Sequence, residues 1–460
     1  MRRWLLLWWL GVGLWAGELE ARLLSALAVV PRGGDAAVAV WDCRAQRWRA
    51  RLGDSAPLRL ASTTKLLVAA AALLVLGPEF SFVTRVHALG PIAQGGVPGI
   101  GVVGGGDPTL DEHFWDGDPE RCFRGWAERL RALGIQRIDG DLLIDNRLFQ
   151  GPLRPPTYPD EGTNLMRWFS APASAFAYND NCIDVRAIPE QLDAPCRIEV
   201  RPRSPRIRIE NRTRAVAAGG DARFDVERHP SANAVSVAGR FSQPTAWFPV
   251  AIHEDPDLLA GDALAAALSD AGIALSGSVR LGAVDARRGP LLVEHRSALL
   301  PALAVMNQRS QNFYGEQILR LIGVRRYGAG SLSAGTRAVR EACQELIGEE
   351  AARFTILDGS GLSYGNTGSA EALTRLLAAM DRHRYGRLFE STLRERAGAG
   401  VQGRVKTGTL ATASCLAGYV EGPRGRLAFA ILLGRGQAAD WSWGPPLRDR
   451  LYELIADAVR

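Results

Sequence analysis

Hydrophobic and polar positions predict strands and buried helices at both ends of the chain. Residues 36–60 alternate between apolar and polar positions, which is typical of a two-stranded hairpin. The next segment, 62–76, is almost wholly apolar and stops at Gly77-Pro78, which predicts a helix buried on most faces. The later patterns predict helices over 299–322, 334–347 and 369–380, strands over 401–407, 413–421 and 427–434, and a terminal helix over 446–459.

The middle of the chain follows a different pattern. Residues 85–177 are mixed, and residues 178–252 form short alternating runs separated by Pro, Gly and Asn, which is typical of β structure. Because strands lie at both chain ends with buried helices between them, the pattern predicts one discontinuous α/β domain built from 18–84 and 286–460. The insertion is expected to form one domain from 85–177 and 253–285 and an inner, mostly β domain from 178–252.

The first residues have the layout of a secretory signal. Arg2 and Arg3 precede an uncharged apolar run, which ends at small residues near Ala16 and Gly17. This run is short for a membrane span, so we expect a signal peptide over 1–17, an exported protein and a periplasmic location. An uncleaved anchor, and with it peripheral association with a membrane, stays open.

Charge and cysteine spacing exclude several function classes. The net charge of +6 is spread along the chain, so we expect no binding to nucleic acid. GIGVVG (99–104) fits a dinucleotide-binding pattern, but no βαβ unit surrounds it. The six cysteines show no zinc-ligand spacing, and we expect no metal or other cofactor. In an oxidising compartment the sequence favours a disulfide between Cys182 and Cys196, with two free thiols as the alternative.

Two lysines differ from every other basic residue of the chain. The sequence has 55 basic residues, and only Lys65 and Lys406 are lysine. Arginine keeps its proton in proteins, whereas a buried lysine can lose it. A site that needs amine chemistry explains why lysine persists at these two positions.

Lys65 follows Ser62 by three residues at the start of a predicted helix, so the two side chains share one face. The positive end of the helix and the apolar surroundings both lower the pKa of a lysine in this place. A neutral lysine beside a serine hydroxyl is a general base beside a nucleophile. Alone, this spacing is weak evidence, because a lysine side chain also extends easily to the surface.

Two further motifs lie later in the chain. Ser310 and Asn312 place a hydroxyl and an amide two residues apart, at the end of a helix or between helices, where both can face a cleft if the backbone turns. Lys406 begins KTGTL at the end of a predicted strand, where Gly408 permits close approach of another backbone. The order SxxK, SxN, KTG is that of penicillin-binding proteins and serine β-lactamases. The candidate catalytic residues are Ser62, Lys65 and Ser310, and the candidate substrate-binding residues are Asn312, Lys406, Thr407, Gly408 and Thr409.

On these motifs the chain resembles the D-alanyl-D-alanine carboxypeptidase and endopeptidase group of low-molecular-mass class C penicillin-binding proteins. The separation of 248 residues between Ser62 and Ser310 is similar to that in this family, which has two domains inserted there. The resemblance implies a serine transpeptidase/β-lactamase-like domain, with an antiparallel sheet flanked by helices, and two inserted domains. Other matching stretches are GGGDPTL (104–110), SQNFYGEQILR (310–320), DGSGLS (358–363) and VKTGTLATASCLAGYV (405–420).

The resemblance also implies an activity. It is that of a serine DD-peptidase, which acts on peptidoglycan peptides and is inhibited covalently by β-lactams. Ser62 is expected to attack the carbonyl of the penultimate D-alanine, with Lys65 as the base that takes its proton. Ser310 is expected to pass a proton to the leaving amine.

The remaining motif residues are implied to bind the substrate. Asn312 is expected to orient Lys65 and the substrate amide. Lys406, with the hydroxyls of Thr407 and Thr409, is expected to bind the terminal carboxylate. The backbone N–H groups of Ser62 and Thr409 are expected to hold the oxyanion.

The chain departs from the family pattern at two positions. The family often has arginine directly after DGSGLS, associated with a free carboxylate of the stem peptide, and Tyr364 stands there instead. Because tyrosine lacks that charge, a stem of the diaminopimelate type is not implied. Gln311 replaces a common aspartate in the middle of SxN, at a side chain expected to point away from the cleft.

Three other interpretations are open. GLSYG (361–365) fits the nucleophile elbow of an α/β-hydrolase with Ser363 as the serine, but the only histidine after it is His383. A serine β-lactamase needs an additional base for deacylation, and its class A pattern ExxLN is approached only by EGTNL (161–165), in which Asn and Leu are reversed. An inactive wall-binding scaffold of the same fold is the third, and the intact lysine pair argues against it.

Overall fold

The computed structural model describes residues 17–53, 56–398 and 400–460, and it divides into two compact units. Unit 1 contains the described residues up to Glu79 together with Leu300–Tyr327 and Leu332–Arg460. Unit 2 contains Phe80–Leu299 and Gly328–Ser331. Apart from Gly17, the expected signal peptide lies outside the described residues. None of the helices in the described part of the chain combines the length and the apolar character that a membrane span requires.

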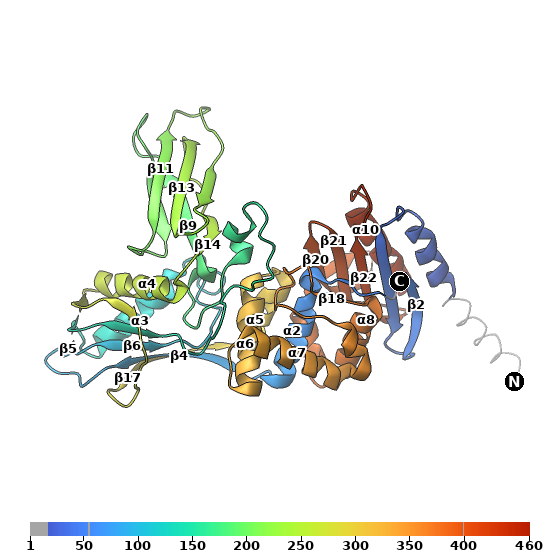
Figure 1. The fold of residues 1–460 in the computed structure, drawn as a ribbon, viewed down its shortest axis with the longest axis horizontal. Coiled ribbons are helices and arrows are strands. Elements are labelled where there is room, and N and C mark those ends of the chain that lie inside the picture. The colour runs from blue at the N-terminus through green and yellow to red at the C-terminus, as the bar shows by residue number, and fades with distance from the viewer. Residues whose placement is uncertain (1–16, 54–55, 399) are drawn as a thin grey trace, which may run out of the picture. The chain divides into compact units, whose positions relative to one another are not determined.

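Unit 1 is built on a six-stranded antiparallel sheet with the order β19-β20-β21-β22-β1-β2. The predicted hairpin consists of β1 (Asp35–Asp42) and β2 (Arg47–Gly53). Strand β1 pairs with β22 (Gly425–Gly434), so the two ends of the chain share one sheet (Figure 1). The other strands are β19 (Arg394–Gly398), β20 (Val401–Leu410) and β21 (Ala413–Gly422).

Helices cover both faces of this sheet. Val40 of β1 belongs to a hydrophobic cluster with α10 and with helical residues 17–27. Ala39 points to the opposite face, where its carbonyl accepts a 3.3 Å bond from the Thr374 hydroxyl of α8. The helices, in chain order, are α2 (Thr64–Val75), α5 (Leu299–Gln308), α6 (Asn312–Tyr327), α7 (Leu332–Ile347), α8 (Ala370–Arg382), α9 (Gly386–Ser391) and α10 (Gly444–Asp457).

Helix α2 is an interior helix. It packs against α6 and α7, and it is buried from Thr64 to Leu73. This position explains its apolar sequence, because a helix that contacts protein on most sides has no polar face. The helix ends before Gly77, whose φ of +86° is a left-handed conformation that glycine adopts readily.

Unit 2 holds the inserted residues. Its main sheet has five strands in the order β16-β8-β6-β4-β17 and shares a hydrophobic cluster with two helices. A small sheet, β15-β7-β5, lies in the same part of the chain. These elements are β4 (Ser81–Ala88), β5 (Gly96–Val97), β6 (Ile100–Val103), α3 (Glu120–Ala132), β7 (Arg137–Ile138), β8 (Leu142–Asp145), α4 (Pro256–Asp270), β15 (Ala274–Leu275), β16 (Val279–Leu281) and β17 (Leu291–Ala298).

The inner part of unit 2 is mostly β structure. It contains two three-stranded sheets, β10-β9-β14 and β11-β13-β12, which contribute to a separate hydrophobic cluster. The strands are β9 (Cys182–Ile188), β10 (Arg197–Arg201), β11 (Arg208–Ala215), β12 (Asp225–Arg228), β13 (Ala234–Phe241) and β14 (Phe248–Ala251). The fold class is therefore the expected one, with an antiparallel sheet between helices and a β-rich inner insertion.

Strands β4 and β17 close the insertion. Ser81 pairs with Ala298, and the N–H of Leu299 donates to the carbonyl of Phe80 at 3.0 Å. The limits of 85 and 285 expected from the sequence therefore lie inside unit 2, because this strand pair continues beyond them. The further division of the insertion at 178 and 252 stays a prediction.

The expected disulfide is wrong, because Cys182 and Cys196 are both free thiols. Cys182 begins β9, where it pairs with Ala251. Cys196 directly precedes Arg197, which pairs with Ile188 at the other end of β9. At about 3.3 Å per residue, the two cysteines lie roughly 20 Å apart along the strand, whereas a disulfide needs Cα atoms within about 7 Å.

Candidate active site

Ser62 lies in a short 3-10 turn, η1 (Ala61–Thr63), directly before α2. Ala61 has a left-handed backbone with a φ of +47°, an uncommon conformation for a residue with a Cβ. The hydroxyl of Thr64 donates to the carbonyl of Ala61 at 2.9 Å and thereby fixes the turn. The half-buried Ser62 side chain consequently stands at the N-terminus of an interior helix.

Lys65 lies one turn later and is wholly buried. Its Nζ donates to Ser62 Oγ at 3.0 Å, to Asn312 Oδ1 at 2.7 Å and to the carbonyl of Ser360 at 2.6 Å. These three acceptors match the three hydrogens of an ammonium group. When the amine is neutral, its lone pair can instead accept the proton of the Ser62 hydroxyl.

Burial is the main influence on the charge of Lys65. It lowers the pKa of Lys65 to about 7, and the negative charges of Asp358 and Glu316 oppose part of this shift. Near neutral pH the neutral amine is therefore well populated. This is the amine environment that the sequence predicts.

The loop 358–361 presents the carbonyl that contacts Lys65. The carboxylate of Asp358 accepts bonds from the backbone N–H groups of Gly361 at 2.6 Å and Ser363 at 2.8 Å. Gly361 has a φ of +82°, and an added Cβ would lie 1.9 Å from the carbonyl oxygen of Ala61. Only glycine fits there, so the loop packs directly against η1.

Helix α6 holds the same loop from another side. Glu316 Oε1 accepts bonds from the N–H groups of Gly359 and Ser360, each at 3.0 Å. Asn312 lies four residues before Glu316, so both side chains share one face of α6. This face positions both the amide and the carbonyl that contact Lys65.

The second lysine is arranged like the first. Ser310 lies between α5 and α6 with a left-handed φ of +61°. Lys406 is buried on β20, and its Nζ donates to Ser310 Oγ and to the carbonyl of Thr407, each at 2.8 Å. Burial lowers the pKa of Lys406 well below its usual range, and the positive charges of Lys65 and Arg394 lower it further. Each serine hydroxyl of the site is therefore bonded to a buried amine.

Strand β20 passes directly beside the turn that carries the first serine. At Gly408 an added Cβ would lie 2.8 Å from the carbonyl oxygen of Leu60 and 3.1 Å from Ala61 Cβ. Thr407 is half-buried and Thr409 is exposed on either side of this contact. Unit 1 thus brings together the residues expected from the sequence, namely Ser62, Lys65, Ser310, Asn312, Lys406, Thr407, Gly408 and Thr409.

An arginine lies beside the residue that departs from the family pattern. Arg59 belongs to β3 (Leu58–Arg59), which pairs with β18 (Thr367–Gly368). Its guanidinium lies over the Tyr364 ring, 4.8 Å from the ring centroid, and donates to the Thr412 hydroxyl. A positive charge therefore lies next to Tyr364, although residue 364 is itself neutral.

The α/β-hydrolase interpretation finds no support in the structure. Ser363 is buried at 1% exposure, and its backbone N–H is bonded to Asp358. His383 directly follows α8, and its ring contacts Tyr385. For the β-lactamase alternative, EGTNL (161–165) lies in unit 2, outside the unit that contains the two lysines.

The comparisons with known proteins agree on one family. Residues 19–444 match the D-Ala-D-Ala carboxypeptidase 3 (S13) family. A D-alanyl-D-alanine carboxypeptidase from Actinomadura sp. (strain R39) is 31% identical over 403 residues, which is 81% of this chain and 72% of that protein. The D-alanyl-D-alanine carboxypeptidase DacB of Haemophilus influenzae is 28% identical over 333 residues, covering 69% of this chain and 65% of that protein.

Solved structures show the same fold. Penicillin binding protein 4 from Haemophilus influenzae matches with a TM-score of 0.75 and 23% identity, over 94% of this chain and 99% of that one. The same protein in complex with a β-lactam matches with a TM-score of 0.71 and 23% identity, over 95% and 99% of the two chains. Because the family match extends over most of its length, this chain belongs to the D-Ala-D-Ala carboxypeptidase 3 (S13) family.

Proposed function

We propose that this serine peptidase removes the C-terminal D-alanine of peptidoglycan stem peptides, cleaves D-alanyl cross-links, or does both, through an acyl-enzyme on Ser62. One observation carries the proposal, the buried Lys65 amine 3.0 Å from Ser62 Oγ. With a pKa lowered to about 7, this amine can take the hydroxyl proton as the oxygen attacks a carbonyl.

The proposed reaction has two stages. In the first, a bond forms between Ser62 Oγ and the substrate carbonyl carbon, and the peptide C–N bond breaks. Ser310 relays to the leaving amine the proton that Lys65 took from Ser62, so that no proton is gained or lost, and its 2.8 Å contact with Lys406 Nζ supports this role. Asn312 keeps Lys65 in place through its 2.7 Å bond. In the second stage, water hydrolyses the ester and restores the serine hydroxyl. All these groups come from side chains of this chain, without a metal or cofactor.

Substrate recognition is assigned to β20. Lys406 gives up its proton easily while it is buried among other cations, and a substrate carboxylate would raise its pKa and bind as an ion pair. The hydroxyls of Thr407 and Thr409 add donors to that carboxylate. Since Gly408 brings β20 against η1, we assign the oxyanion to the backbone N–H groups of Ser62 and Thr409.

β-Lactams carry an amide carbonyl and a carboxylate, and we propose that they acylate the same serine. The cell-wall substrate and the leader-like residues 1–17 support export of the protein, with the periplasm as its location. In this assignment the peptidoglycan peptide is the physiological partner, and the β-lactam is a covalent inhibitor.

Purified muropeptides test the proposal. The protein is incubated with uncross-linked pentapeptides and with cross-linked dimers, and the products are separated and weighed by mass spectrometry. Loss of one alanine identifies carboxypeptidase activity, and conversion of dimers to monomers identifies endopeptidase activity. Ser62→Ala is expected to abolish both. A folded protein that cleaves neither substrate, or whose Ser62→Ala variant remains active, would contradict the assignment.

A further inference from the structure

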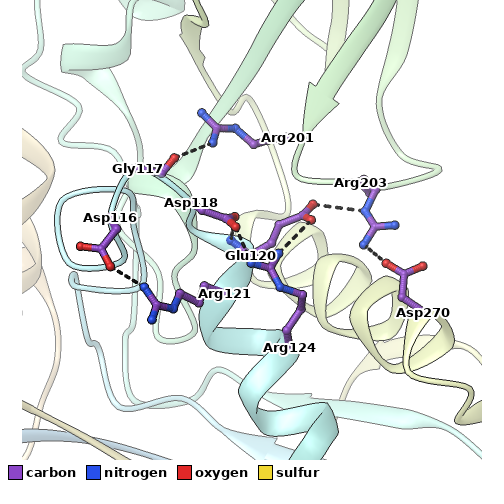
Figure 2. Close-up of polar contacts among 9 residues, drawn as sticks. All are labelled: Asp116, Gly117, Asp118, Glu120, Arg121, Arg124, Arg201, Arg203 and Asp270. Carbon is purple, nitrogen blue, oxygen red and sulfur yellow. Dashed lines mark hydrogen bonds and ion pairs between the residues drawn. The ribbon is translucent and has the colours of Figure 1, made fainter.

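Arginines around α3 are matched by carboxylates (Figure 2). Arg203 contacts Glu120 at 3.2 Å and Asp270 at 2.5 Å. Arg201 is almost fully buried, and it pairs with Asp184 at 3.2 Å. Such a partner offsets the free-energy cost of removing a guanidinium from water.

Arg228 on β12 and Arg154 have no such partner among the described residues. Arg228 is 1% exposed, and one of its contacts is a 3.1 Å bond to the carbonyl of Leu165. Arg154 donates to the carbonyls of Ser170 and Ile252, each at 2.8 Å. In the described part of the chain, neither guanidinium has a carboxylate within 4.0 Å. Carbonyl groups accept bonds from both guanidiniums, although Arg228 Nε has no hydrogen-bond partner among the described residues, and they leave the positive charge uncompensated.

The charge of Arg228 persists near neutral pH. Burial, with a smaller contribution from the neighbouring charge of Arg154, lowers the pKa of Arg228 to about 10. At pH 7 the guanidinium therefore remains protonated. A buried cation without a counter-ion is strongly unfavourable, and an anion that binds nearby would relieve that cost.

A cavity of about 400 Å³ lies beside Arg228. This volume is within the range that small organic ligands occupy. Exposed Arg167 also lines it and makes no ion pair in the described residues, whereas Arg223 pairs with Asp225 at 3.7 Å on the exposed rim. Glu227 is the other acidic residue of the lining. The apolar wall consists of Met166, Phe224, Val226, Phe248 and Val250.

The lining combines a positive field with an apolar surface. Walls of low dielectric constant focus the field of the arginines into the cavity, which attracts anions. The aromatic and aliphatic side chains favour an apolar group attached to that anion. A planar guanidinium binds a carboxylate through two parallel hydrogen bonds.

We propose that this cavity is a second binding site, which takes a small carboxylate-bearing peptide. Arg167 binds the carboxylate directly, the buried charge of Arg228 attracts it, and an apolar side chain of the ligand packs against Phe224 and Phe248. The choice of a peptide rests on the proposed function of the enzyme, whereas anion binding rests on the cavity alone.

Isothermal titration calorimetry of the full chain tests the proposal. The protein carries Ser62→Ala, which prevents turnover, and the probe is N-acetyl-D-alanyl-D-alanine at low salt. A second binding event is expected, weakened about tenfold by Arg167→Gln and unchanged by Arg129→Gln, a matched exchange at an exposed arginine of α3. The C-terminal amide of the probe, which lacks the carboxylate, is expected not to bind there.

Other outcomes separate this site from the active site. If Lys406→Ala removes all binding and Arg167→Gln removes none, the peptide binds only at the active site and the second site does not exist. Equal binding of the C-terminal amide, or equal competition by inorganic phosphate, would overturn the assignment to a carboxylate-bearing peptide. Because Arg167 is exposed, its variant is expected to fold, and an unchanged thermal unfolding midpoint checks this.

Discussion

The two lysines occupy matching environments. Each amine is buried and bonded to a serine hydroxyl, Lys65 to Ser62 at 3.0 Å and Lys406 to Ser310 at 2.8 Å. In both cases burial is the largest influence on the pKa, and it acts against the charged form. An arginine in either place would remain a cation. At the scale of the residue, both positions therefore keep a side chain whose amine can gain or lose a proton.

Replacement of Lys65 by arginine keeps the positive charge and removes the proton acceptor. We expect acylation of Ser62 by penicillin to slow at least about a hundredfold. Intact-protein mass spectrometry over time measures the adduct, and the thermal unfolding midpoint checks that the variant is folded. Acylation at the parent rate by a folded Lys65→Arg protein would show that no neutral amine is needed.

The acylation rate is expected to depend on pH through Lys65. The folded-state pKa of about 7 means that the reactive neutral amine predominates above pH 7 and declines below it. The second-order rate constant for penicillin should therefore fall about tenfold per pH unit below about 6 and level off above about 8. Rates measured by stopped flow over this range test the prediction. A flat profile, in protein that circular dichroism shows to be folded throughout, would contradict it.

At the scale of the element, the site depends on segments that contact each other through glycine. Gly361 brings loop 358–361 against η1, and Gly408 brings β20 against the same turn. Neither contact leaves room for a Cβ. The close approaches therefore transmit any displacement of the loop or of β20 to Ser62.

Gly361→Ala tests this packing. The added Cβ would lie 1.9 Å from the Ala61 carbonyl oxygen, so the loop must move. We expect a loss of about 3 kcal/mol in the free energy of unfolding and a large loss of penicillin acylation. Gly77→Ala is the matched control, because Gly77 has a similar φ of +86° with nothing within 4 Å of an added Cβ. It should cost only about 1 kcal/mol and leave acylation unchanged. Equal effects of the two substitutions in urea denaturation would show that the close contact is unimportant.

Elements with regular patterns were predictable from the sequence. The strands predicted over 401–407, 413–421 and 427–434 are present as β20, β21 and β22. Strands β21 and β22 are buried almost throughout, which explains their apolar runs, whereas buried and more exposed positions alternate over most of β20. The break between α5 and α6 at residues 309–311 is not visible in the helical periodicity of 299–322, because apolar spacing does not reveal the left-handed backbone of Ser310. The SxN motif, rather than the periodicity of apolar residues, identifies Ser310 as a candidate.

The residues that hold Lys65 and its loop in place are harder to predict from the sequence. Ser360 contacts Lys65 through a backbone carbonyl, a group that every residue has. Glu316 holds this loop through bonds from the backbone N–H groups of Gly359 and Ser360, which no side-chain motif indicates. The DGSGLS stretch was the only signal for this loop, and it came from a family resemblance. The prediction of a disulfide between Cys182 and Cys196 is wrong for a related reason. Strand pairing places the two cysteines at opposite ends of β9, and their spacing in the sequence does not reveal which strands pair.

At the scale of the whole molecule, the insertion has adjacent ends. Phe80 and Leu299 are joined by a 3.0 Å backbone hydrogen bond, and Ser81 pairs with Ala298. A short turn can therefore replace the inserted residues without stretching the chain. The two lysines and their serine partners all lie in unit 1.

A shortened chain tests the independence of unit 1. In it, an Asn-Gly turn replaces residues 82–297, so that the ends of β4 and β17 form a hairpin. We expect this protein to unfold cooperatively and to be acylated by penicillin on Ser62, because the polar contacts of the site are retained. A version that also carries Ser62→Ala is the control for adducts elsewhere. A cooperatively folded but unreactive product would show that the insertion contributes to catalysis.

The pairing of β1 with β22 also affects the order in which the sheet forms during synthesis. Strand β1 can pair with β2 soon after both are made, but its other edge must wait for the last strand of the sheet, since its second partner is residues 425–434. A growing polypeptide therefore contains Ser62 and Lys65, the proposed nucleophile and base, long before it contains Lys406 on β20. The site that contains both amines is therefore completed only late in synthesis, after nearly the whole chain has emerged from the ribosome.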